Sequence, residues 1–224
     1  MAKKRRKPKM EFRYYQMSAG SPILALLGQK WVQNYGNGVD YLHFHNYLEI
    51  GYCYGGDGHM ILGEEEERFY GGIVTVIPPN YPHTTNSDIG TVSKWEYLFI
   101  DVEGFMKKFL DNPVKAEKVI QRIYSRVLFF EEKEHLSISK KIRKIMDIMR
   151  DGEEFFLEEA KGVLAALLVE IARLNRDSGE DKVAEDAGKL TNMVTRVLDY
   201  VSYHYMEDIK VEDLANICHI SETH

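Results

Sequence analysis

Hydrophobic positions change their period near the middle of the chain. Between residues 24 and 101, short apolar or alternating runs recur at roughly ten-residue spacing, separated by glycine-rich turn clusters. The run from Ile73 to Ile77 is apolar throughout, as in a strand buried on both faces. Pro78 ends this run, because proline cannot donate to a strand ladder. The pattern predicts a β-sandwich or barrel.

Helical spacing replaces this pattern after the β region. Apolar residues recur every three or four positions across 137–150 and form a wider stripe across 156–174. Asp151-Gly152 marks a turn between them, so two amphipathic helices in an antiparallel hairpin are expected. The stripe fits either a dimer seam or packing on the barrel within one chain, and its residues are Leu164, Leu167, Leu168 and Ile171.

The last part of the chain predicts a linker and further helices. Residues 176–188 are polar, charged and glycine-containing, which is typical of a flexible linker. Beyond them, apolar residues share one helical face from Leu190 to Met206, and Val211 to Ile217 predicts a short helix. Ser221 is a favourable N-cap for another helix. A helix, a three-residue turn and a capped second helix form a helix-turn-helix unit, of which this sequence contains the beginning.

The charge distribution changes how the helix-turn-helix is interpreted. The net charge is −6, but the N-terminal tail carries six lysines and arginines and no acidic residue, so the remainder has 23 basic and 35 acidic side chains. An acidic surface is poorly suited to nucleic acid. We therefore expect a solvated basic tail and a body that does not bind DNA specifically by itself.

Cysteine content and hydropathy predict a cytoplasmic protein. Cys53 and Cys218 are far apart and form no disulfide framework, which favours a reducing compartment. No run of about 18 apolar residues is present that could span a membrane. The basic N-terminus lacks the apolar core of a secretory signal.

Three histidines and a glutamate form the strongest candidate for a functional site. Residues two apart on a strand point to the same side, so His43, His45 and Glu49 can share a face that His83 approaches from a second strand. Converging imidazoles and a carboxylate suit a divalent transition metal such as zinc, nickel, iron(II) or manganese. The same groups also suit hydrogen bonding to a small effector, or a purely structural framework.

The spacing of these residues resembles the two sequence motifs of the cupin β-barrel superfamily. The motifs read Gly38-x4-His43-x-His45-x3-Glu49-x6-Gly56 and Gly72-x5-Pro78-x-Asn80-x2-His83-x2-Asn86. Asn80 replaces the expected glycine, and the first spacer is one residue short. The resemblance implies a cupin-type β-sandwich or barrel (double-stranded β-helix), and in cupin enzymes such a set of three histidines and one glutamate is a metal site.

Aromatic residues are dense in the β region, and strand alternation should turn about half of them inward. Aromatic faces with a few polar tips suit a sugar or an aromatic acid. The predicted effector site therefore combines the polar set with three aromatic side chains: His43, His45, Glu49, His83, Tyr52, Trp95 and Tyr97.

The C-terminal stretch resembles the start of the DNA-binding domain of AraC-type transcription regulators. The matching positions are Tyr200-Val201-Ser202-Tyr203-His204-Tyr205, Glu212-Asp213-Leu214-Ala215 and Ile220-Ser221, while His219 and Lys210 depart from the pattern. Many such regulators carry a cupin-like sensor followed by helices, which is the order of elements predicted here. The resemblance spans about residues 20–224.

The resemblance implies a regulator rather than an enzyme. It implies a homodimer that binds a small effector, requires no cofactor and contacts DNA only as the full-length protein. It also implies a second helix-turn-helix, so this sequence would end inside the DNA-binding domain, with Ser221, Glu222, Thr223 and His224 opening the recognition helix. The alternative is a metal-dependent cupin enzyme, such as an isomerase or dioxygenase, with a helical tail.

The expected fold class is α+β, with five parts along the chain. These are a disordered basic tail (1–10), a cupin-like effector-binding barrel (11–105), a helical subdomain expected to dimerise (106–175), the linker (176–188) and the beginning of the helix-turn-helix domain (189–224).

Overall fold

The computed structural model divides the chain into two compact units, Met1–Asp177 and Ser178–His224. It describes residues 9–29, 32–33, 41–176, 196–197, 200–201, 204, 206–218 and 220. Four predictions lie wholly or largely outside these residues: most of the basic tail, the linker beyond Arg176, the helix from Leu190 to Met206, and the DNA-contacting set Ser221, Glu222, Thr223 and His224.

One of the two sheets in the first unit has five strands, in the spatial order β1-β4-β9-β6-β7. These strands are β1 (Lys9–Arg13), β4 (Tyr41–His45), β9 (His83–Ser87), β6 (Gly58–Leu62) and β7 (Glu65–Phe69). Strand β1 pairs with β4 in parallel, and the other neighbours pair antiparallel. The N-terminal strand therefore lies beside the strand that carries His43 and His45.

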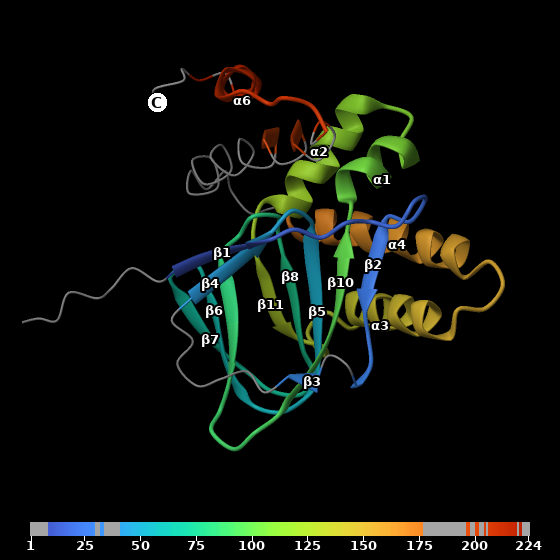
Figure 1. The fold of residues 1–224 in the computed structure, drawn as a ribbon. Helices are drawn as coiled ribbons and strands as arrows, with labels where there is room; N and C mark the ends of the chain where they lie inside the picture. The colour runs from blue at the N-terminus through green and yellow to red at the C-terminus, as the bar shows by residue number, and fades with distance from the viewer. Residues whose placement is uncertain are drawn as a thin grey trace, which may run out of the picture. The chain divides into compact units, whose positions relative to one another are not determined.

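The second sheet is antiparallel and follows the order β11-β8-β5-β10-β2, with β3 paired to β10. Its strands are β11 (Leu128–Glu131), β8 (Ile73–Ile77), β5 (Leu48–Gly55), β10 (Ser93–Ile100), β2 (Ile23–Leu26) and β3 (Val32–Gln33). The two sheets enclose one apolar core, to which Met60 and Phe69 contribute from the first sheet and Trp95 and Phe99 from the second (Figure 1). The predicted cupin-type β-sandwich is confirmed.

Strand β11 was not predicted, because it is a short segment between two helices in a region whose dominant period is helical. Leu128 and Phe130 are buried and alternate with half-buried neighbours, as in an edge strand with one covered face. The strand pairs with β8, so the second sheet includes residues beyond the predicted barrel region.

Four helices share an apolar core with the second sheet. They are α1 (Val102–Phe109), α2 (Pro113–Tyr124), α3 (Leu136–Asp151) and α4 (Phe156–Leu174). In Figure 1, α3 and α4 lie against the face of this sheet, and α1 and α2 lie beyond one end of its strands. Side-chain caps begin the first two: Asp101 accepts a hydrogen bond from the Gly104 amide, and Asn112 accepts one from the Lys115 amide. Gly152, at φ 63°, ends α3 in the left-handed conformation that glycine tolerates best.

The apolar stripe of α4 packs inside this unit. Its four side chains, Leu164, Leu167, Leu168 and Ile171, have no exposed surface and join the core between the helices and the second sheet. Of the two interpretations left open by the sequence, packing within one chain accounts for them. They are not available as a seam with a second copy, because α2 and α3 pack around α4.

The second unit contains a described helix, α6 (Val211–Cys218), which agrees with the predicted helix to within one residue. Lys210 stands where a serine or threonine cap is common, but its backbone amide donates to the Asp213 carboxylate at 3.0 Å. This contact satisfies an amide at the helix start from within the helix. Among the described residues, no helix is both long and apolar enough to cross a membrane.

Candidate functional site

The four predicted polar residues meet at one end of the sandwich interior. His43 and His45 come from β4, Glu49 from β5 in the opposite sheet, and His83 from the start of β9. His43 and His83 are direct partners in the β4–β9 ladder, and their ring centroids are 4.2 Å apart. The β4–β9 pairing and the packing of the two sheets therefore bring together residues that are up to 40 positions apart in sequence, whereas the sequence analysis expected His43, His45 and Glu49 on one face of a strand.

Glu49 lies at the centre of this cluster. Its side chain is 5% exposed, with Oε2 3.1 Å from Nε2 of His45 and Oε1 3.6 Å from Nε2 of His83. Among the described residues, no lysine or arginine forms an ion pair with it. The buried carboxylate therefore depends on imidazoles for its electrostatic partners.

The second nitrogen of two imidazoles faces a backbone carbonyl. Nδ1 of His45 is 2.8 Å from the Tyr47 carbonyl oxygen, and Nδ1 of His83 is 2.8 Å from that of Tyr81. A carbonyl oxygen only accepts, so each Nδ1 carries the proton and donates it. Each ring thus has an acceptor on both sides, because Nε2 faces the Glu49 carboxylate. Such a ring must either bind a second proton or offer its Nε2 lone pair to a cation or donor.

The buried environment opposes the second proton. Burial lowers the pKa of His45, although Glu49 partly compensates, and burial together with the neighbouring His83 lowers the pKa of His43 to about 2. Burial also opposes ionisation of Glu49, yet His83 and His45 together hold its pKa well below its usual range. The site is therefore an anion surrounded by basic nitrogens, rich in acceptors and poor in donors.

Three of the four residues could hold a metal ion. One ligand atom from each of His43, Glu49 and His83 lies within 4.8 Å of the other two. Ligand atoms about 2.1 Å from a tetrahedral ion are about 3.4 Å apart, so the most widely separated pair of the trio would need to close by up to about 1.4 Å. His45 lies outside the trio and contacts the other carboxylate oxygen of Glu49. The structure thus gives His45 a positioning contact, whereas the sequence motif suggested a fourth ligand.

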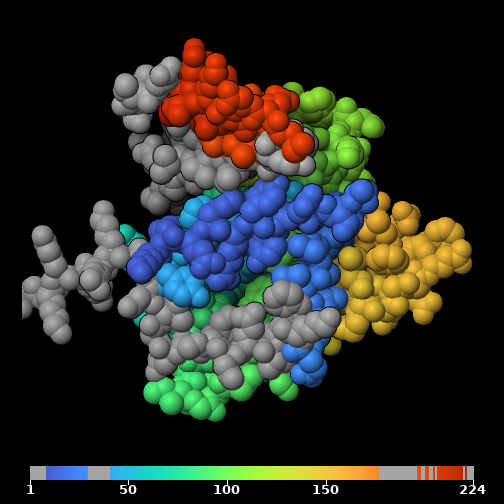
Figure 2. All heavy atoms as spheres, viewed as in Figure 1, coloured from blue at the N-terminus to red at the C-terminus, as the bar shows by residue number. Residues whose placement is uncertain are grey.

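The segment after β1 closes this end of the sandwich. Tyr15 stacks on Phe99 with ring centroids 3.9 Å apart and meets the edge of His45 at 6.1 Å. Asn46 holds the segment, since its Oδ1 accepts from the Tyr15 amide and its Nδ2 donates to the Tyr15 carbonyl, both at 3.0 Å. The N-terminal segment, coloured blue, runs across this side of the molecule (Figure 2). Sequence reasoning missed Tyr15 and Asn46, because neither belongs to a motif.

Two of the three predicted aromatic residues face the same interior. Phe99 is the β10 partner of Glu49, and Tyr97 and Trp95 follow on the same side of the strand, opposite Gly51 and Cys53. Trp95 and Tyr97 are stacked, with centroids 5.9 Å apart and an interplanar angle of 9°. They form the apolar layers beneath the polar cluster.

Tyr52 is not part of this cluster. It lies between Gly51 and Cys53 on β5, so alternation turns it to the outer face of the sheet. Its hydroxyl donates to the Glu132 carboxylate at 2.6 Å, and the Arg143 guanidinium lies over its ring at 5.6 Å. The structure therefore places this predicted effector contact against the helical layer.

Comparisons with known proteins agree with the fold. A family model described as "AraC-like ligand binding domain" matches residues 34–168. Apo ToxT K231A from Vibrio cholerae strain SCE256 is similar in structure, with a TM-score of 0.54 at 10% sequence identity over 90% of this chain and 72% of that one. The AraC-like transcriptional activator CuxR gives a TM-score of 0.41 at 12% identity over 80% of this chain and 58% of that one. No curated protein matches the sequence.

Proposed function

Since the chain belongs to the family of AraC-like ligand binding domains, we propose that it is the effector-sensing part of a transcription regulator. The effector binds at the polar cluster inside the sandwich, next to Glu49. In a longer protein, ligand binding at this point would bias how the helices beyond the sensor are presented to DNA. The order of sandwich, helical layer and α6 along the chain supports this proposal.

The acceptor-rich character of the cluster defines the class of ligand. The carboxylate of Glu49 and the Nε2 atoms of His45 and His83 all accept, so the ligand must supply positive charge or hydrogen-bond donors. A divalent transition metal ion, such as zinc, nickel, iron(II) or manganese, meets this need directly. A hydroxyl-rich molecule such as a sugar is the organic counterpart. An anion is disfavoured, because Glu49 already carries a buried negative charge.

Thermal unfolding of the 224-residue chain tests this function. A ligand at about 100 times its Kd should raise the melting temperature by roughly 5–10 °C for a chain of this size. The panel is the four divalent metal ions and a set of sugars, with His83→Gln as the variant that removes one contact. The ligand should shift the wild type and not the variant. The proposal fails if the panel leaves both unchanged, or if a binder leaves operator binding by the full-length regulator unaltered.

A metal-dependent cupin enzyme is the second candidate, and the trio His43, Glu49 and His83 is the observation in its favour. Three protein ligands would leave coordination positions open for a substrate. Elemental analysis of protein made without chelators, compared with a His83→Ala variant that removes one ligand of the trio, tests this function. Absence of stoichiometric metal would rule out the enzyme. Bound metal without catalytic turnover would instead support the metal as the effector.

Assembly as a homodimer completes the proposal. Two-fold symmetric regulators match the two half-sites of a DNA operator. The α4 stripe is buried within the chain, so the dimer contact must use a different surface.

A further inference from the structure

The outer face of the second sheet changes from apolar to polar along its strands. On β5, Leu48 and Ile50 face the helices and have no exposed surface, whereas the next residues on the same side, Tyr52 and Tyr54, carry hydroxyl groups. On β10 the residue opposite Tyr52 is Glu96, a carboxylate. The apolar layer beneath the helices therefore stops short of this end of the sheet, where Tyr54 is 44% exposed.

A pocket with a volume of about 370 Å³ lies at this end, and we call it the outer pocket. Its lining comes from four places in the chain: Tyr54 near the end of β5, the start of β10, the helix α3, and Gly28 with Gln29 beyond β2. Ligand pockets in proteins have volumes of about 300–1,000 Å³. The outer pocket is therefore large enough to hold a small molecule.

The two carboxylates of the outer pocket already have hydrogen-bond donors. Glu96 is 8% exposed, and its Oε1 accepts from the Gly28 amide at 2.8 Å while its Oε2 accepts from Arg150 at 2.5 Å. Arg150 also donates to Asp147 at 2.6 Å. These bonds join the sheet, α3 and the segment after β2 into one wall, in which both carboxylates contact the same guanidinium.

Two further cations line the outer pocket outside this group of bonds. Lys94 forms no ion pair with any residue that the structure describes. Arg143 lies 3.5 Å from Glu132, but both side chains are more than a third exposed, and such a pair contributes little. The Arg143 guanidinium is placed over the Tyr52 ring, 5.6 Å from its centroid. The three cations of the pocket outnumber its two carboxylates by one, which suits a ligand with a single negative charge.

The Tyr54 ring supplies an aromatic surface beside these cations. It meets the Tyr52 ring edge to face, with centroids 4.7 Å apart, and its hydroxyl lies 3.9 Å from the Met146 sulfur. These contacts hold the ring in place, while its remaining surface lines the outer pocket. Aromatic rings pack favourably on one another in offset or edge-to-face geometry. The ligand that fits is therefore aromatic as well as singly charged.

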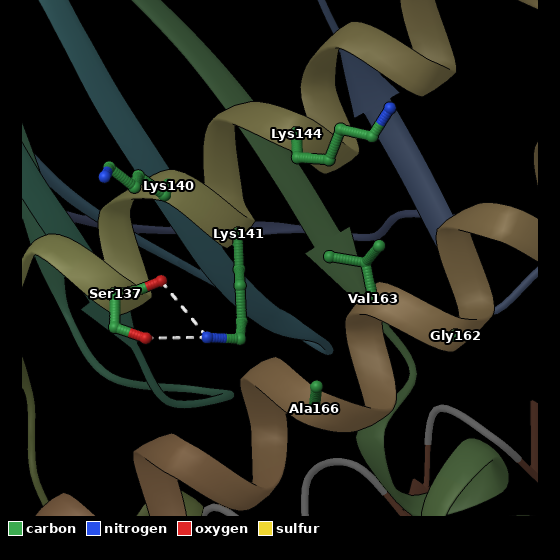
Figure 3. A pocket seen from close by; sticks show the side chains of 7 residues that line it. All are labelled: Ser137, Lys140, Lys141, Lys144, Gly162, Val163 and Ala166. Carbon is green, nitrogen blue, oxygen red and sulfur yellow. Dashed lines mark hydrogen bonds between the residues drawn. The ribbon is translucent and has the colours of Figure 1, made fainter.

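The groove between α3 and α4 is less selective, although its volume is larger, at about 480 Å³ (Figure 3). Lys141 pairs with Glu170 at 2.7 Å and Lys144 with Glu159 at 2.9 Å, so much of the positive charge on its α3 side is neutralised. Lys141 also donates to the Ser137 hydroxyl, as Figure 3 shows. The lining of this groove, which lies wholly within the described part of the chain, includes no aromatic side chain. The groove therefore offers nothing that selects one class of ligand.

We propose that the outer pocket is a second ligand site, which binds a small aromatic monocarboxylate. The carboxylate pairs with Arg143 and Lys94, and the aromatic ring packs on Tyr54. Arginine favours this ligand because its planar fork can donate two parallel hydrogen bonds to one carboxylate. The cluster around Glu49, on the other face of the same sheet, has the opposite character, because it accepts hydrogen bonds and disfavours an anion. The outer pocket does not depend on the ligand of that cluster.

An NMR titration of the ¹⁵N-labelled 224-residue chain with phenylacetate tests the proposal. The amide signals of Gly28 and Lys94 should shift, with a Kd of about 1 mM or below for a ligand of this size. Phenylacetamide is neutral and should bind at least about tenfold more weakly, because a charge-assisted pairing is lost. Cyclohexylacetate keeps the charge but is not aromatic, and should bind about three- to tenfold more weakly.

Four variants locate the binding. Arg143→Gln should weaken phenylacetate binding about tenfold. Lys118→Gln is the matched control, because it removes the same charge from an exposed position of α2 that does not line the pocket. Tyr54→Leu should remove the preference for phenylacetate over cyclohexylacetate. Glu49→Gln separates the two sites, since phenylacetate in the outer pocket should bind this variant and wild type equally.

Several results would overturn the second site. They are an absence of shifts at Gly28 and Lys94, equal binding of phenylacetamide and phenylacetate, and equal losses of affinity in Arg143→Gln and Lys118→Gln. A loss in Glu49→Gln without a loss in Arg143→Gln would also overturn it, because phenylacetate would then bind inside the sandwich. None of these results decides whether the cluster around Glu49 binds a metal ion or a sugar, so the two proposals fail separately.

Discussion

Nε2 of His45 and Oε2 of Glu49 lie 3.1 Å apart inside the sandwich, while Nδ1 of the same ring lies 2.8 Å from the Tyr47 carbonyl. The ring is thus held between two acceptors. His83 repeats the arrangement with Glu49 and Tyr81. Acceptor atoms in such a buried cluster need a cation or a hydrogen-bond donor as a partner, and this need is the physical basis for assigning the ligand site here.

Replacing Glu49 by glutamine should abolish binding of a divalent metal while retaining the fold. Glutamine has the same shape but no charge, and a neutral amide oxygen is a weaker ligand for such an ion than a carboxylate. We expect an affinity loss of at least about 100-fold, because ligand residues dominate metal affinity. Isothermal titration with Zn²⁺ measures it, and circular dichroism checks the fold. Unchanged Zn²⁺ affinity would show that the metal binds elsewhere.

Acid should destabilise the metal-free protein through His43. Burial lowers the pKa of this histidine from 6.5 to about 2, so the unfolded chain binds a proton over this window that the folded chain does not. The neutral His43 ring therefore makes its full contribution to the free energy of unfolding above pH 6.5. This free energy falls as the pH drops below 6.5, by at most about 1.4 kcal/mol per pH unit for one group. Urea unfolding at pH 6.5 and 5.0, with a chelator present, should show a loss of about 2 kcal/mol that His43→Gln reduces. Equal losses in both proteins would argue against a buried neutral His43.

The segment that covers the site should loosen in Asn46→Ala. This substitution removes both hydrogen bonds to the Tyr15 backbone, which together are worth about 1–3 kcal/mol. We expect faster hydrogen exchange at the Tyr15 amide and faster release of a bound ligand, since Tyr15 lies over His45 and Phe99. Arg13→Ala is a nearby control that leaves these two bonds in place. Ligand release at the wild-type rate in Asn46→Ala would mean that this segment does not limit access.

Tyr52→Phe should reduce stability without changing ligand affinity. The substitution removes the hydrogen bond to Glu132 on the outer face of the sheet, at a cost of about 1 kcal/mol. Ligand affinity depends on the inner face, where Gly51 and Cys53 flank this position. Urea unfolding and a ligand titration on the same preparation separate the two effects. A loss of ligand affinity would instead show that Tyr52 contributes to the effector site, as the sequence analysis predicted.

The members of the polar cluster were predictable from the sequence because their spacing is recognisable, but their arrangement was not, since Glu49 lies on β5 in the opposite sheet and not on one strand face with His43 and His45. Tyr52 could not be assigned in the same way, because density of aromatic residues does not reveal which face each one occupies without the register. The position of His45 beside Glu49, rather than within the metal-ligand trio, depends on how its ring is placed in the folded sandwich. Such placement comes from packing in three dimensions and cannot be inferred from sequence spacing.

Two other kinds of feature could not be predicted from the sequence: strand pairing between distant segments, and the partner against which an apolar helix face packs. The strand β11 has only four residues, and its paired residues in β8 are 52 to 58 positions away in sequence, so local periodicity did not indicate it. The α4 stripe illustrates the second limit, since a helix buried against its own chain and a helix buried against a partner have the same pattern. The left-handed conformation of Phe155 has no local sequence signature.

The most direct test of the account is to observe the imidazole nitrogens themselves. In ¹⁵N-histidine-labelled, metal-free protein at neutral pH, NMR should find His83 with a proton on Nδ1. Addition of one equivalent of Zn²⁺ should shift the signals of His83 Nε2 and of a ring nitrogen of His43. His135, which packs on Phe130 at the start of α3, should not respond. The opposite result, with His43 and His83 unchanged while other histidines respond, would contradict the assignment of this cluster as a metal-binding effector site.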